Sequence, residues 1–262
     1  MPDVVTLLDA AHAAVSADPE NEALRLRFFE RLADGEMVIL LEREAVGESL
    51  EPKVFALEDG PVVLVFDREE RLASFTGGIA PYAALPGRVI AGLLKGQGIG
   101  MGVNLGVAPS SMLLPPEALD WLAETLADGP EEAEALPEEF LPPMVPEAVI
   151  AALDGKLARA GGLAASALLA GVVYAGGRRG HLLALIDAAE GAEPALARAM
   201  NEALVFSGIE AGELDVVFLA TDSPAAQAMA KVALRFDLPK PQVQDLAPAA
   251  PGMDPSRPPK LR

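Results

Sequence analysis

The chain has 262 residues, of which 51% are hydrophobic and 23% are charged, with a net charge of −19 and no cysteine. This composition excludes a disordered chain, and the lack of cysteine excludes disulfides and thiolate chemistry. A strongly negative field repels phosphate groups, so we expect neither nucleic-acid binding nor docking to an anionic membrane. No secretory signal pattern and no run of about 18 apolar residues is present, so we expect a cytoplasmic protein.

The first segments have helical spacing of their apolar residues. Thr6–Ala17, with Thr6 as N-cap, and Asn21–Ala33 predict two helices that form a helical hairpin. Three short apolar runs then predict strands at Met37–Leu41, Val54–Leu57 and Pro61–Phe66. The last two flank an Asp-Gly pair, which favours a β-hairpin.

Strand and helix patterns alternate over the rest of the first part. Asp67–Phe75 opens with acidic residues and predicts a short helix, and a loop containing Gly77-Gly78 and Pro81-Tyr82 separates it from a helix at Arg88–Lys95. A strand is expected at Met112–Leu114 and a further helix from Pro116. This order predicts an α+β or α/β fold.

The stretch at 128–147 divides the chain, because it holds five prolines and seven acidic residues but no Lys or Arg. Residues 1–127 carry nine basic and twenty acidic side chains, which gives −11; residues 148–262 carry eleven and twelve, which gives −1. We therefore predict two domains, 1–127 and 148–238, joined by an acidic proline-rich linker at 128–147 that partly docks on them. The proline-rich residues 239–262 are expected to form an extended tail or a docking peptide.

The second part reads as an αββαβα domain. The predicted elements are a helix at Pro146–Ala160, strands at Ala167–Tyr174 and His181–Asp187, a helix at Glu193–Phe206, a strand at Leu214–Ala220 and a helix at Ser223–Leu234.

Several of these segments together resemble a known family. The FALEDGPVVLVFDREERLASF unit, the LLPPEALDWL segment, and the stretches YAGGRRGHLLALID and LVFSGIEAGELDVVFLATD follow one another in an order similar to that of the SseB family. The resemblance covers nearly the whole chain and implies an SseB amino-terminal domain followed by an SseB carboxy-terminal domain. The family name is attached to enhanced serine sensitivity and to type III secretion, and it brings no catalytic signature.

Local motifs give no catalytic constellation. The glycines of Gly96–Gly102 follow a predicted helix and precede a strand, the reverse of the order in a dinucleotide-binding loop, so we interpret them as a glycine-rich turn or edge strand. The two histidines, His12 and His181, are too few for a histidine-rich metal site. We therefore predict no enzyme activity, no metal and no cofactor.

Two groups of residues are candidates for binding. Arg178, Arg179 and His181 at a hairpin, with Ser223 at a helix start, are a candidate anion site, because guanidinium groups and helix amides both bind anions. A solvated turn and an ordinary helix cap are the simpler readings.

Apolar residues near loops or the divider form the second group. They are Tyr82, Trp121, Phe140 and Met144, and they are candidates for contact with a partner or between the domains.

The resulting hypothesis is a non-catalytic protein-interaction or adaptor protein of the SseB type, with the acidic first domain facing a protein partner. Two alternatives stay open: a sensor of amino acids or anionic metabolites that uses Arg178, Arg179 or Ser223, and an acidic chaperone for a secreted basic client. A homodimer is possible in each case, and the chaperone predicts one.

Overall fold

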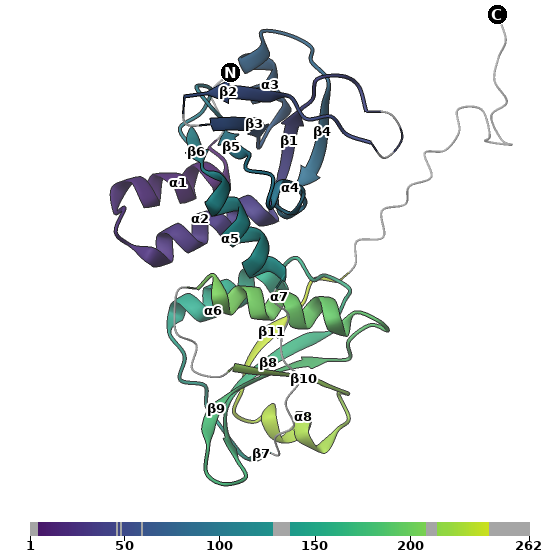
Figure 1. Cartoon of the computed structure of the whole chain (residues 1–262). Coiled ribbons are helices and arrows are strands. Elements are labelled where there is room, and N and C mark those ends of the chain that lie inside the picture. Colours follow the sequence, from purple (N-terminus) through teal and green to yellow (C-terminus); the bar gives the residue numbers. More distant parts are fainter. Residues whose placement is uncertain are drawn as a thin grey trace, which may run out of the picture.

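The computed structural model describes residues 5–45, 47, 49–58, 60–127, 137–207 and 214–240. Within these residues the chain forms eight helices and two mixed sheets, one of six strands and one of five, which confirms the predicted α+β class. One sheet belongs to residues 5–127, called the first half below, and the other to residues 137–240, called the second half. Figure 1 shows helices of both halves lying between the two sheets.

The first half contains five helices and six strands. Their bounds are α1 Leu7–Ala17, α2 Glu22–Asp34, β1 Glu36–Leu40, β2 Val54–Leu57, β3 Gly60–Phe66, α3 Glu69–Thr76, β4 Tyr82–Pro86, α4 Gly87–Leu94, β5 Gly100–Val103, β6 Met112–Leu114 and α5 Pro116–Ala127. The strand order is β4-β1-β3-β5-β6, and β2 also pairs with β3. All pairs are antiparallel except β3 with β5.

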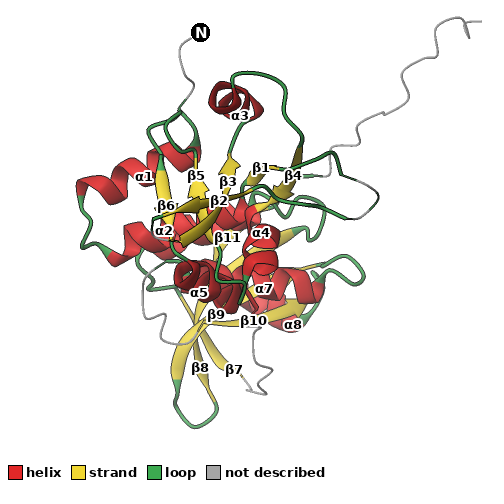
Figure 2. Cartoon of the chain, turned by 45° about the horizontal axis from the view of Figure 1, so that its top comes forward, coloured by secondary structure: helices red, strands yellow, loops and turns green. Residues whose placement is uncertain are grey.

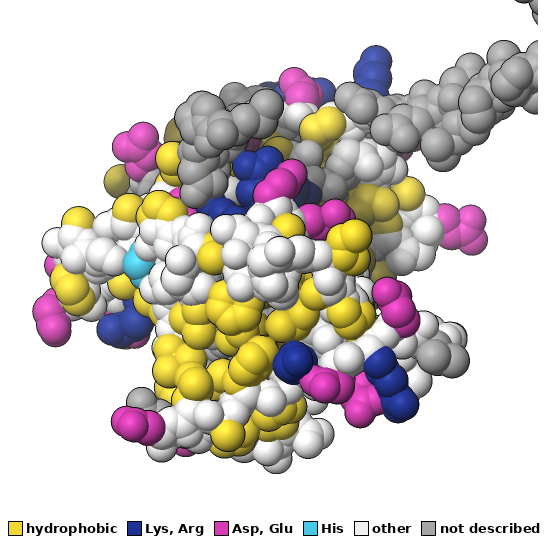
Figure 3. Space-filling model, turned by 90° about the horizontal axis from the view of Figure 1, so that it is seen from above, with side chains coloured by type: hydrophobic (Ala, Val, Ile, Leu, Met, Phe, Trp, Pro, Cys, Tyr) yellow, Lys and Arg dark blue, Asp and Glu magenta, His cyan; other side chains and the backbone are white. Residues whose placement is uncertain are grey.

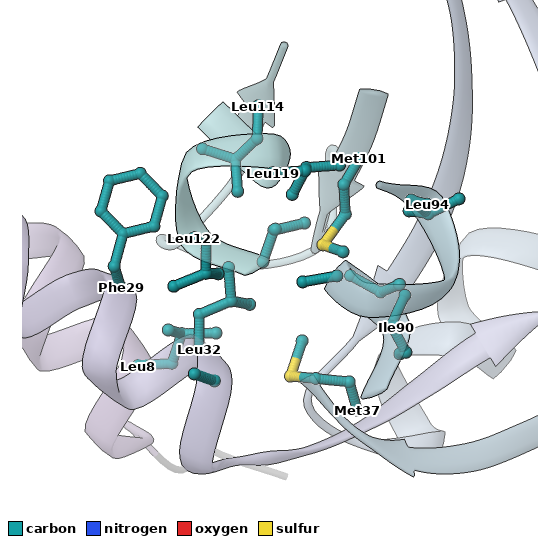
Figure 4. Packing of buried hydrophobic residues seen from close by; sticks show 14 of the residues in the cluster. Leu8, Phe29, Leu32, Met37, Ile90, Leu94, Met101, Leu114, Leu119 and Leu122 are labelled. Atoms are coloured by element: carbon teal, nitrogen blue, oxygen red, sulfur yellow. The ribbon is translucent and has the colours of Figure 1, made fainter. Parts of the chain in front are cut away.

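Alternate residues of β1 are buried on opposite faces of this sheet. Met37 and Ile39 pack in a core with α1, α2, α4 and α5, whereas Val38 and Leu40 pack with Leu72 of α3. Figure 4 shows side chains of the larger core meeting between the helices and the sheet. In Figure 2, α3 stands apart from the other helices of the first half. The sheet is therefore covered on both faces, and α3 is the helix that covers the second face within the described residues.

The second half contains three helices and five strands. Their bounds are β7 Pro137–Leu141, α6 Glu147–Leu157, β8 Ser166–Tyr174, β9 Arg179–Ile186, α7 Glu193–Val205, β10 Leu214–Leu219, α8 Pro224–Met229 and β11 Leu234–Asp237. The order is β10-β9-β8-β11, with β7 beside the other end of β8, and only β9 and β10 run parallel. Helices α6 and α7 cover one face of the sheet, and α8 packs on the other.

Close packing of α4 on α2 depends on Gly87. A Cβ atom at this position would lie 1.9 Å from the carbonyl oxygen of Leu32 in α2. Only glycine permits this approach, and it places Arg88 of α4 next to Asp34 at the end of α2. The ends of α2 and α4 thus form a charged surface that faces the second half.

Four segments differ from the sequence predictions. The region before Arg88, predicted as loop, contains β4, which pairs with β1. The glycine-rich run contains β5, which lies inside the sheet between β3 and β6. The helix predicted at Ser223–Leu234 ends at Met229, and β11 follows and pairs with β8.

The fourth difference concerns the predicted linker at 128–147. Its residues 137–141 form β7, which pairs with β8, and residues 128–136 lie outside the described part. Of the predicted tail, Pro239 accepts a hydrogen bond from the N–H of Gly162, and residues 241–262 also lie outside the description. In the described ranges, no helix has the length and apolar character needed to cross a membrane.

Candidate protein-binding surface

A recess of about 460 Å³ lies between α3 and the segment that leads into β4. Its lining includes Glu69, Glu70, Leu72, Ala73, Ile79 and Tyr82. The sequence builds it by ending α3 at Gly77, which adopts a left-handed conformation (φ 73°) and turns the chain back along the helix. We call this feature the α3 recess.

The α3 recess has an exposed apolar wall. The side chain of Ile79 is fully exposed, and Tyr82 and Phe75 of the same region are 40% and 39% exposed. Figure 3, which views the molecule from above, shows hydrophobic side chains gathered in groups on the upper side of the molecule, with charged side chains around them. Because an exposed isoleucine gains free energy when it is covered, Ile79 makes the α3 recess a candidate place for contact with another molecule.

Acidic groups border the apolar wall. Glu69 and Glu70 lie in the first turn of α3, where the helix dipole favours negative charge. The neighbouring Glu69 carboxylate raises the pKa of Tyr82, through hydrogen bonding and its charge. The recess therefore combines an apolar surface with two carboxylates, of which Glu70 also pairs with Arg68 at the surface, at 3.7 Å. This pattern suits an apolar residue next to Lys or Arg.

A buried ion cluster holds α3 in place. The Arg71 guanidinium of α3 donates hydrogen bonds to Asp9 of α1, at 3.0 Å for one of them, and to Asp67 at 2.8 Å. Ser110 also donates to Asp9, and Asn104 donates to Ser110. Arg71 and Asp9 are 3% and 2% exposed. We call these residues the Arg71 cluster.

Burial works to raise the pKa of Asp9, but the hydrogen bonds from Arg71 and Ser110 outweigh it and hold that pKa well below the usual range. Asp9 is thus ionised at neutral pH and fixes Arg71. Since Arg71 lies in α3, the cluster determines where the helix that lines the α3 recess sits on the sheet.

A second buried ion cluster joins the two halves. Lys156 of α6 donates to Asp34 of α2 at 2.8 Å and to Glu202 of α7 at 3.0 Å, with Glu30 of α2 at 3.8 Å. Arg88 of α4 binds both carboxylate oxygens of Glu202, at 2.9 and 3.0 Å. Arg88 and Arg159 also each donate to Asp34. We call these six residues the Lys156 cluster.

The carboxylates of the Lys156 cluster respond differently to burial. For Asp34 and Glu202, burial works to raise the pKa, but hydrogen bonds from Lys156 and Arg88 lower it overall. For Glu30, burial dominates over the charge of Lys156 and the pKa is raised. The cations therefore stabilise the ionised forms of Asp34 and Glu202. The more distant Lys156 charge does not offset the cost of burying an ionised Glu30.

The structure separates the residues predicted to bind an anion. Arg178 stacks over the Tyr174 ring at 4.1 Å and donates to Asp215 at 3.1 Å, so its charge is already matched. The Nε2 atom of His181 accepts a 3.4 Å hydrogen bond from the Met144 N–H. Arg179 begins β9 at the hairpin.

Ser223 lies at the other end of the β9–β10 pair and caps α8 by accepting from the Ala226 N–H at 3.2 Å. Arg178 and Arg179 lie at the start of β9, whereas Ser223 follows the paired ends of β9 and β10. The four residues do not form one site.

The predicted contact residues also lie in different places. Tyr82 lines the α3 recess. Trp121 of α5 makes edge contacts with Phe29 at 5.1 Å and with Phe206 of the second half at 6.4 Å. Phe140 of β7 packs partly buried beside β8, and Met144 is 88% exposed. Of these four residues, one lies at the recess and one between the halves.

The sequence prediction missed Ile79, Glu69 and Glu70 as a group. The only signal was an isoleucine between Gly77-Gly78 and Pro81, where turn residues are usually polar. Within the described ranges, no group of three or more His, Asp or Glu is placed to hold a metal ion. No family model, curated protein or solved structure matches the chain. The likeness to the SseB family remains a prediction from the sequence.

Proposed function

We propose that this chain is a non-catalytic cytoplasmic protein-interaction protein of the SseB type, and that the α3 recess binds a partner segment carrying an apolar side chain beside Lys or Arg. The observation that carries the proposal is Ile79, which is fully exposed in a recess bordered by Glu69 and Glu70.

Two further features support a basic partner. The first part of the chain carries −11 of the net charge, so its field attracts a positively charged segment and speeds its approach. The buried side chain of Arg71, itself a residue of α3, fixes the helix that bears both glutamates, so the recess is largely pre-formed.

The two alternative functions are affected differently. The pairing of Arg178 with Asp215 weighs against a metabolite sensor at the hairpin, because an anion would have to compete with a carboxylate. A chaperone for a basic client would use the same acidic recess. It would differ from the proposed interaction protein in binding an unfolded client rather than a folded partner.

A direct test uses two synthetic peptides, one alternating Leu with Arg and one with Glu in place of each Arg. The chain is labelled with ¹³C at its isoleucine δ-methyl groups, and each peptide is titrated in. We expect the Ile79 methyl signal to shift with the basic peptide only, and the shift to weaken in high salt because exposed charges are then screened. Ile150 of α6, in the other half, is the internal control and is expected to stay in place.

Variants extend the test to cellular partners. Proteins captured from a native lysate are compared between the unchanged chain, a variant with Ile79→Ser, Glu69→Gln and Glu70→Gln, and Leu93→Ser as the control, since Leu93 of α4 is also exposed, at 54%. We expect a stoichiometric partner to be lost only from the triple variant. An unmoved Ile79 signal, or equal loss from Leu93→Ser, contradicts the proposal.

A further inference from the structure

Strand β10 lies at the edge of the second sheet. Among the described residues it pairs with β9 and with no other strand. All six of its residues, Leu214 to Leu219, are half-buried. Its side chains alternate between two cores: Leu214, Val216 and Phe218 face α6 and α7, and Val217 and Leu219 face α8. The side chains are thus covered on both faces, and the edge offers its backbone.

The register identifies the backbone groups that point outward. Leu219 pairs with Ile186, and the Leu219 carbonyl accepts a hydrogen bond from the Asp187 N–H at 3.0 Å. Leu219 therefore directs its N–H and C=O toward β9. Because the direction alternates along a strand, the odd-numbered residues pair with β9, and Leu214, Val216 and Phe218 direct their N–H and C=O groups to the open side.

This edge lacks the usual protection against pairing. Edge strands are commonly guarded by Lys, Pro, a bulge or an unpaired inward charge. The sequence LDVVFL contains neither Lys nor Pro, its pairing with β9 runs without a register shift, and its one charge, Asp215, is bound by Tyr174 and Arg178. The open side of β10 is therefore suited to receive another strand.

We propose that β10 pairs antiparallel with β10 of a second copy of the chain, about a two-fold axis that passes through the sheet at Val216. In this register Val216 lies opposite the partner's Val216, and Leu214 opposite the partner's Phe218. The outward groups at Leu214, Val216 and Phe218 are then all satisfied, by six hydrogen bonds in total.

Three features favour a second copy over a different partner. The set of outward groups is centred on Val216, so the strand matches itself without a shift. A two-fold axis perpendicular to the sheet places the α6–α7 core of both copies on one face and the α8 core of both copies on the other. A continuous sheet across the two copies requires this arrangement. The charge also permits it, since residues 148–262 carry only −1 and Asp215 comes to lie opposite the partner's Val217 rather than opposite its own copy.

The oligomeric state of the full chain tests this proposal. Sedimentation velocity over a concentration series is expected to show a dimer for the unchanged chain. Val216→Pro removes an outward N–H from each copy and leaves the β9 ladder intact, so we expect dimerisation to weaken about tenfold or more with unchanged circular dichroism. Val217→Pro is the matched control, because it removes an N–H that pairs with β9, and we expect it to lower the melting temperature.

Hydrogen exchange tests the same edge without a substitution. The amides of Leu214 and Phe218 are expected to gain protection as the protein concentration rises. A chain that stays monomeric, or a Val216→Pro variant that dimerises as tightly as the unchanged chain, overturns the proposal. So does protection of Phe218 that is independent of concentration, because another segment of the same chain, such as residues 241–262, then covers the edge. The α3 recess lies in the first half, so failure here is distinguishable from failure of the proposed function.

Discussion

The Arg71 cluster and the Lys156 cluster are both buried, but the first links elements within one half of the molecule and the second links the two halves. Arg71 binds Asp9 and Asp67, and the cluster is completed by neutral groups, Ser110 and Asn104, all within the first half. Lys156 binds Asp34 and Glu202, and every member of its cluster carries a formal charge. The first cluster fixes a helix on its own sheet, whereas the second joins the two halves, which also meet where Phe206 packs into the core of the first half.

The difference indicates separate roles. Burial of an ion pair costs desolvation free energy that its attraction only partly returns, so such pairs contribute more to a defined arrangement than to stability. In the Arg71 cluster the arrangement is that of α3 and hence of the α3 recess. In the Lys156 cluster it is the placement of α6 and α7 against α2 and α4. Loss of the second cluster should therefore loosen the contact between the halves, and the part of the first core that Phe206 completes should loosen with it.

The largest effect is expected from Lys156→Met, which removes the cation that bridges Asp34 of the first half and Glu202 of the second. It leaves Asp34 and Glu202 with fewer cations in a buried place, and we expect the free energy of unfolding to fall by about 3–5 kcal/mol. Urea denaturation followed by circular dichroism measures this, and the two halves should unfold in separate transitions.

Lys95→Met is the control for this substitution. Lys95 is also paired with a glutamate, Glu124, at 3.5 Å, but it is 42% exposed. We expect a change below about 1 kcal/mol. Equal effects of the two substitutions would mean that burial does not distinguish the Lys156 cluster from a surface pair.

A smaller effect is expected from Asp9→Asn, which breaks the Arg71 cluster. At pH 7 we expect a loss of about 2–3 kcal/mol, because a hydrogen-bonded charge is removed beside a buried guanidinium. The folded-state pKa of Asp9 lies below its ordinary value of 3.8, so its contribution is complete above that value and is lost as the pH falls toward the folded-state pKa.

The pH dependence sharpens this prediction. Between about pH 5 and pH 2 the stability of the unchanged chain should fall more steeply than that of Asp9→Asn, as measured by urea denaturation at each pH. Asp154→Asn, at an exposed position of α6, serves as control and should keep the original slope. Parallel curves for Asp9→Asn and the unchanged chain would show that Asp9 does not titrate with folding.

Local sequence signals predicted much of the fold because the deciding contacts are local. Thr6 was predicted to cap α1, and the capping box with Asp9 is present. The Asp-Gly pair predicted the β2–β3 hairpin, which is confirmed by their antiparallel pairing. In both places the residues that fix the backbone lie within a few positions of one another.

Strands that depend on distant partners were missed. The glycines of Gly96–Gly102 were interpreted as a turn or an edge strand, whereas β5 lies inside the sheet. A Cβ at Gly100 would lie 2.6 Å from the carbonyl oxygen of Leu114, so glycine allows β5 to pack beside β6. The helix predicted at Ser223–Leu234 ran into the first residue of β11, and no element was predicted for the rest of this strand. Its Arg235 and Phe236 pair with Leu168 and Ala167 of β8, far back in the chain. Whether such a segment forms a strand depends on pairing partners that only the folded sheet brings beside it.

The charge clusters were equally hidden in the sequence. Lys156 and Asp34 are 122 residues apart, and each resembles an ordinary surface charge on an amphipathic helix. Tyr82 was singled out because it is aromatic and near a loop, but its role at the α3 recess depends on Ile79 and Glu69, which only the turn at Gly77 brings beside it.

The smallest effect is expected from Glu30→Gln. This substitution tests whether Glu30 contributes to stability differently from Asp34 and Glu202, the other carboxylates of the Lys156 cluster. Burial raises the pKa of Glu30, so the folded state disfavours its ionised form, and stability is lost as the pH rises through the folded-state pKa. Glutamine keeps the shape without the charge, and Lys156 retains Asp34 and Glu202. We therefore expect the Glu30→Gln variant to be slightly more stable than the unchanged chain at pH 7, by less than about 1 kcal/mol.

Thermal unfolding at pH 7 and pH 4 measures this difference, and the gain should appear only at pH 7. Glu36→Gln, at an exposed position of β1, is the control and should leave the stability unchanged at both pH values. A loss as large as that of Lys156→Met would instead place Glu30 among the carboxylates that hold the two halves together.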